Sequence, residues 1–189
     1  MRLNTMHSYL WRKLPIALLL VTLQAAHASA DPVIWNGPMI SFERGSIIMD
    51  EDAWMLEENQ DRITDNVWIT RGATKGIFNA RVEGFPDGVP NPGPAGTAWA
   101  IGSTADDLSM LPFGTWLDAV SSNPPGSVGV NYVVHLIEDD IYLDLKFTEW
   151  GQRTSGGSFS YVRSTAVPEP TSVALLAVGA ASLGWRRRR

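Results

Sequence analysis

The chain has 189 residues, among them 15 lysines and arginines, 20 aspartates and glutamates, three histidines and no cysteine. The lack of cysteine excludes disulfides, thiolate metal sites, a cysteine nucleophile and an acylated cysteine anchor. Three of the basic residues lie in residues 1–30 and four in residues 166–189, which leaves eight basic against 19 acidic residues in 31–165. A net charge near −11 over that middle part disfavours nucleic acid as a partner.

The N-terminal segment has the pattern of a secretory signal peptide. Arg12 and Lys13 precede an apolar run from residue 14 to about residue 23, and Ala28 and Ala30 are the small residues that signal peptidase requires. We therefore expect residues 1–30 to form a signal helix that is cleaved before Asp31.

Residues 31–165 have the length of one domain. Stretches in which apolar and polar residues alternate, or which are rich in β-branched and aromatic residues, predict strands. Stretches rich in glycine, proline or acidic residues predict the turns between them. In chain order, the expected strands are 39–42, 46–49, 66–70, 76–82, 130–137, 141–148 and 159–163. Single helical turns are expected within 50–60 and within 104–111, the second capped by Thr104, and 84–96 reads as a loop.

The last three strands predict an antiparallel meander, and 66–70 with 76–82 predicts a hairpin. Many short strands without a long helical period are typical of an all-β domain. We expect an antiparallel β-sandwich with jelly-roll-like connectivity.

Six of the eight tryptophans lie in residues 31–165. Trp68 and Trp150 fall on the strand faces opposite the apolar ones, so both are candidates for stacking against sugar rings. Burial in the core is the alternative for any tryptophan of a small domain.

Acidic residues occur in clusters, and Asp139 and Asp140 are the candidate ligands for calcium. No stretch has the spacing of a continuous calcium-binding loop, and a solvated acidic rim explains the same residues. Calcium is therefore an open alternative, and no other cofactor is expected.

The sequence does not predict an enzyme. His135 is the one histidine of residues 31–165 and alternates with apolar residues inside an expected strand, and no Gly-x-Ser-x-Gly motif is present. A pair of carboxylates for glycoside hydrolysis stays open, because such a pair needs only two acids at a suitable distance.

The C-terminal segment combines three features. Pro168, Glu169 and Pro170 predict a stiff, extended and accessible peptide. The uncharged stretch 173–185 follows, shorter than the roughly 17–25 residues of a stable membrane span. The chain then ends on a basic stop formed by Arg186, Arg187, Arg188 and Arg189. We expect a short transmembrane helix that serves as a temporary anchor.

This order of features resembles the PEP-CTERM class of exported bacterial proteins. The resemblance covers residues 167–189 and implies that an exosortase, a membrane-embedded cysteine transpeptidase, cleaves near Pro168–Pro170. It also implies a Gram-negative producer and a place in an exopolysaccharide or biofilm matrix. Two stretches, 58–72 and 135–165, resemble segments of exported bacterial proteins of unassigned function.

The predicted protein is thus an exported, non-catalytic surface or matrix component in three parts: 1–30, 31–165 and 166–189. The expected partners are signal peptidase, the exosortase, exopolysaccharide and, transiently, the inner membrane. A carbohydrate-binding module and a carboxylate-based glycoside hydrolase are the alternatives.

Overall fold

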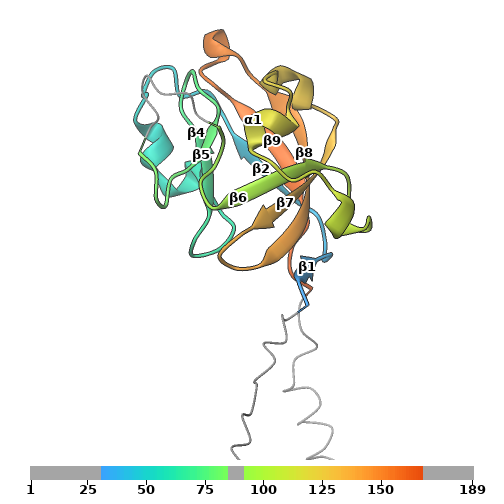
Figure 1. The fold of residues 1–189 in the computed structure, drawn as a ribbon. Coiled ribbons are helices and arrows are strands. Elements are labelled where there is room, and N and C mark those ends of the chain that lie inside the picture. Colours follow the sequence, from blue (N-terminus) through green and yellow to red (C-terminus); the bar gives the residue numbers. More distant parts are fainter. Residues whose placement is uncertain (1–30, 85–91, 168–189) are drawn as a thin grey trace, which may run out of the picture. The chain divides into compact units, whose positions relative to one another are not determined.

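The computed structural model describes residues 31–84 and 92–167 (Figure 1). Nine strands dominate: β1 Val33–Trp35, β2 Ile40–Arg44, β3 Asp61–Arg62, β4 Trp68–Arg71, β5 Ile77–Asn79, β6 Thr97–Ile101, β7 Asn131–Leu136, β8 Ile141–Trp150 and β9 Phe159–Arg163. The one α-helix of the described ranges is α1, Trp116–Ala119. Single 3₁₀ turns occur at Ala53–Met55, Glu57–Asn59, Leu108–Met110, Pro124–Ser127 and Arg153–Ser155.

The strands form two sheets. The larger has the order β2-β9-β8-β7-β6 with β1 added in parallel to β8, and the smaller has the order β3-β4-β5. All other pairings are antiparallel, so the predicted all-β class, the meander and the hairpin are confirmed. Because β6 to β9 are neighbours in sequence order, this sheet has the order of a meander and not of a jelly roll. The expected signal helix and C-terminal membrane helix lie outside the described residues.

Both sheets contribute to one hydrophobic core, an arrangement compatible with the predicted sandwich. Leu143, Leu145 and Phe147 alternate along β8 and belong to the same buried cluster as Ile69 of β4 and Ile77 of β5. The period-2 pattern of β8 therefore marks the face of the larger sheet that meets the smaller one.

A buried ion pair also joins the two sheets. The Arg163 guanidinium on β9 donates to both oxygens of Asp61 on β3, at 2.6 and 2.8 Å, and the Tyr161 hydroxyl donates to the same carboxylate at 2.7 Å. The two charged side chains are almost fully buried, with relative exposures of 7% and 9%. The bidentate geometry and the third donor satisfy the carboxylate that burial has removed from water.

One expected strand and one expected cap are wrong, whereas the helical turn expected within 104–111 is present at Leu108–Met110. Residues 46–49 form a turn, because β2 loses its neighbour where β9 begins at Phe159, paired with Arg44. Thr104 caps no helix: its backbone N–H and its hydroxyl donate to the two oxygens of Asp144, and Asp107 caps the 3₁₀ turn instead.

Replacing Asp61 by alanine should lower the free energy of unfolding by about 3–5 kcal/mol, because Arg163 would stay buried without its partner. Urea unfolding followed by tryptophan fluorescence measures this change. The control is Asp65→Ala at an exposed position, with an expected change within about 0.5 kcal/mol. Equal effects of the two substitutions would contradict the importance of the ion pair.

Alkaline pH should destabilise the fold through Tyr161. Burial, and then the nearby charge of Asp61, raise the pKa of Tyr161 well above its usual value of 10.0. The unfolded chain therefore loses this proton first, and stability falls as the pH rises above about 10, by up to about 1.4 kcal/mol per pH unit.

Unfolding of the wild type and of Tyr161→Phe, measured from pH 8 to pH 11, tests this dependence. The variant should lose less stability over that range, and other groups that titrate there cancel in the comparison. Parallel pH profiles for the two proteins would show that Tyr161 does not carry the effect.

Candidate functional site

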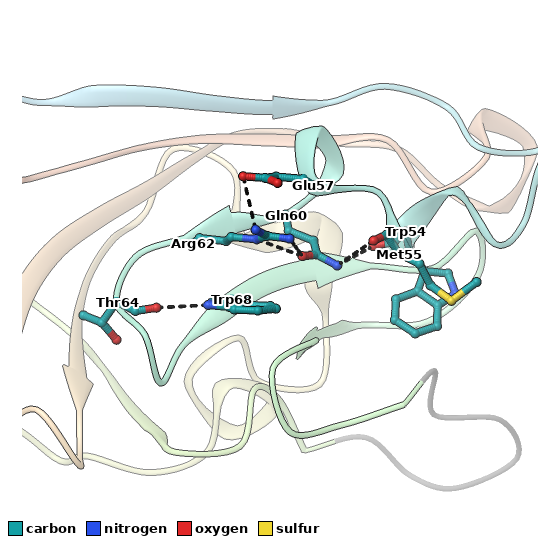
Figure 2. Close-up of polar contacts among 7 residues, drawn as sticks. All are labelled: Trp54, Met55, Glu57, Gln60, Arg62, Thr64 and Trp68. Atoms are coloured by element: carbon teal, nitrogen blue, oxygen red, sulfur yellow. Dashed lines mark hydrogen bonds and ion pairs between the residues drawn. The ribbon is translucent and has the colours of Figure 1, made fainter.

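Trp68, the first candidate for stacking on sugar, lies on β4 opposite Arg62 of β3. It is half-buried, and its indole N–H donates to the Thr64 carbonyl at 3.1 Å (Figure 2). The Arg62 guanidinium lies over the ring at 4.3 Å from its centroid, and that of Arg81 lies 5.4 Å away. Cation–π contact of this kind already occupies a face of the ring.

Arg62 is itself held in place by neighbouring side chains. Its guanidinium donates to Gln60 Oε1 at 3.2 Å and pairs with Glu57 at 3.1 Å, and the Gln60 amide donates to the carbonyls of Trp54 and Met55 (Figure 2). These contacts connect the 3₁₀ turns after β2 to the edge strand β3. A sugar that stacks on Trp68 would have to displace a guanidinium that several acceptors hold.

Trp150, the second candidate, ends β8 beside a different arginine. The Arg71 guanidinium lies 3.9 Å from the centroid of the Trp150 ring, and the Trp116 ring lies 5.3 Å from it at 31°. Trp150 is only half-buried, however, and borders a cleft of about 350 Å³. The cleft is lined by Arg71, Thr74, Lys75, Gly76, Pro124, Pro125, Trp150 and Gln152.

Arg71 is almost fully buried although it belongs to no ion pair among residues 31–84 and 92–167. Its Nε donates to the Lys75 carbonyl at 2.6 Å, and its Nη1 donates to the carbonyls of Gly151 and Ser158. Arg44 of β2 lies nearby and likewise donates only to carbonyls, those of Gly45, Gly72 and Gly157. Burial lowers the pKa of each arginine to about 10, so both keep their charge at neutral pH.

The backbone permits this arrangement only with glycine at residue 157. Gly157 has a φ of +66°, and a Cβ atom there would collide with the Gly72 carbonyl. The β8–β9 connection and the β4–β5 turn therefore meet at a contact that side chains would prevent. Arg44 donates to the carbonyls of both Gly72 and Gly157 and so connects the two segments.

The expected calcium ligands take part in structural contacts. Asp139 accepts from the Thr64 hydroxyl at 2.7 Å and from the Asn66 amide at 2.8 Å, and Asp140 lies 3.2 Å from His135. His135 also stacks on Tyr142, with ring centroids 4.1 Å apart. In the described parts of the chain, no three histidine, aspartate or glutamate side chains are grouped closely enough to hold a metal ion.

Sequence reasoning missed the two arginines without acid partners. Arg44 and Arg71 end their strands next to glycine, and nothing in the local pattern distinguishes them from exposed strand ends. Composition offers one signal. Residues 31–165 have only eight basic residues, so an arginine on the inward face of an expected strand is a candidate for a structural or binding role.

Within residues 31–84 and 92–167, no helix has both the length and the apolar character needed to cross a membrane. The predicted sorting residues Pro168 to Pro170, the arginine stop and the cleavage residues Ala28 and Ala30 lie outside the described residues.

Comparison with curated proteins found no match, and comparison with solved structures found none either. One family model matches: that of the PEP-CTERM protein-sorting motif, over residues 166–189. This chain therefore carries a PEP-CTERM sorting signal, as expected of an exported protein that is an exosortase substrate.

Proposed function

We propose that this protein is a non-catalytic component of the cell surface or extracellular matrix of a Gram-negative bacterium. The match of residues 166–189 to the PEP-CTERM motif is the observation that carries the proposal. Signal peptidase removes residues 1–30, the segment 173–185 holds the chain briefly in the inner membrane, and an exosortase cleaves near Pro168–Pro170. The folded part then associates with exopolysaccharide in the surface or biofilm matrix.

The described part of the chain supports a non-catalytic role. Three of its acids, Asp61, Asp139 and Asp144, have both carboxylate oxygens engaged in structural hydrogen bonds. His135 is stacked on a tyrosine and paired with Asp140, and among the described residues its ring has no hydrogen bond to a serine or threonine hydroxyl. A general acid or base would instead need an unengaged group facing a substrate.

Carbohydrate binding is the second candidate function, and the cleft beside Trp150 favours it. The cleft combines flat apolar groups, Pro124, Pro125 and Trp150, with the polar side chains Thr74 and Gln152. Sugar rings offer apolar faces and hydroxyl edges that suit such a mixture. The glycoside hydrolase alternative has no comparable support.

The processing of both ends tests the proposal. The protein recovered outside its producing cells should begin near Asp31 and end near Pro168–Pro170, without the terminal arginines. Intact mass together with identified terminal peptides measures both ends. Alanine substitution of Pro168, Glu169 and Pro170 should keep the tail on the chain and retain it in the membrane fraction.

The matched control is Glu138→Ala, an exposed position in the β7–β8 turn that should leave both termini unchanged. A wild-type protein that keeps residues 186–189 outside the cell, or stays in the membrane with them, would contradict exosortase processing. Release of sugar products from the producer's matrix by the purified protein would contradict the non-catalytic role.

A further inference from the structure

Two buried arginines of this domain lie near each other, and neither has an acidic partner among the described residues. Taken over the whole residue, the relative exposures of Arg44 and Arg71 are 1% and 3%, comparable to the 5% of Arg163, which has Asp61 as its partner. Every hydrogen bond that Arg44 and Arg71 donate within the described ranges goes to a backbone carbonyl. A buried positive charge without a counter-charge is costly, and two neighbouring ones repel each other.

The repulsion is evident at Arg71, where burial and then the charge of Arg44 lower the pKa. A third cation, Lys75, lines the cleft beside Trp150 together with Arg71, and it has no ion-pair partner among the described residues. Glu149, one residue before Trp150, accepts from the Ser158 hydroxyl at 2.9 Å and pairs with none of the three cations. Three of the eight basic residues of 31–165 thus gather at one place in an otherwise acidic domain.

Arg71 also faces the cleft directly. Its Nε and Nη1 are engaged with carbonyls, whereas its Nη2 makes no hydrogen bond to residues 31–84 or 92–167. This leaves a charged donor at the wall of a cleft of about 350 Å³, a volume within the range of small-ligand sites. A purely structural role would explain the carbonyl contacts, but it requires neither the free donor nor Lys75 beside it.

We propose that the cleft between Lys75 and Trp150 binds the carboxylate of an acidic sugar. Arg71 Nη2 and the Lys75 ammonium would donate to the carboxylate, since charge-assisted hydrogen bonds of this kind are the stronger ones. Pro124, Pro125 and the exposed part of Trp150 would contact the sugar ring, and Gln152 a hydroxyl. The anionic group follows from the two cations that line the cleft, Arg71 and Lys75, with the charge of Arg44 nearby. The attachment of that group to a sugar rests on the proposed matrix function.

Titration of the full-length protein, purified in a mild detergent, with a uronic-acid oligomer tests the proposal. Trp150 lines the cleft and packs against the buried Trp116, so tryptophan fluorescence should change on binding. The fully methyl-esterified oligomer is the matched neutral ligand, and it should bind at least tenfold more weakly because it cannot accept charge-assisted bonds as an anion. Higher salt should weaken binding of the acid alone.

Lys75→Gln should weaken binding of the uronic-acid oligomer about fivefold, the loss expected of a partly exposed ion pair. The matched control is Lys146→Gln, another half-exposed lysine without an acid partner, on β8 away from this cleft. It should leave the affinity unchanged. Circular dichroism of both variants establishes that they are folded.

Equal affinity for the acid and its ester, or equal effects of the two lysine substitutions, would overturn the proposal. Inorganic sulfate that competes at the same concentration as the oligomer would overturn the sugar part of it. These outcomes are distinct from failure of the proposed function. If the protein binds the oligomer but keeps its C-terminal arginines, exosortase processing is contradicted and the binding site is not. If the protein is processed but does not bind the oligomer, only the binding site is contradicted.

Discussion

The contact between the two sheets depends on buried arginines as well as on apolar side chains. The smaller sheet has only three short strands, of two, four and three residues, and Ile69 and Ile77 are their side chains in the shared core. The Asp61–Arg163 ion pair fixes the edge strand β3 to β9, and the Tyr161 hydroxyl donates a third hydrogen bond to the Asp61 carboxylate. Since such a pair tolerates little displacement, it sets the position of β3, and therefore of β4 and β5, on the larger sheet.

At the other end of the sheets, Arg71 and Arg44 make the equivalent connection with carbonyls in place of a carboxylate. Arg71 joins β4 to the ends of the β8–β9 connection, and Arg44 joins β2 to both the β4–β5 turn and that connection. The carbonyls engage most of the donors but leave Arg44 Nε and Arg71 Nη2 without a partner among the described residues. Carbonyls also carry no net charge, so no described acid neutralises the positive charge of this end by an ion pair. The same two contacts thus stabilise the sheets and create an electrostatic preference for an anion.

The sequence predicted the strands that alternate strictly and the C-terminal motif, because both signals are local. β8 is the clearest case, since each inward residue is apolar. The edge strand β3 has only two residues, too few for a pattern, and β6 contains two alanines, a residue that is depleted in strands. Helix α1 had a local signal that went unused, the capping box of Thr115 and Asp118. The cleft could not be predicted, because its residues come from the β4–β5 turn, residues 124–125 and the end of β8.

The sorting signal and the proposed binding cleft of this chain are encoded in different ways. The sorting signal occupies a continuous stretch, residues 166–189, and a short family model recognises it without any structure. The cleft depends on three distant segments that the folded sheets bring together, so no stretch of comparable length carries it. The local gathering of Arg71 and Lys75 in a domain with a large negative net charge likewise becomes visible only once the fold is known, because it depends on which segments the sheets bring together.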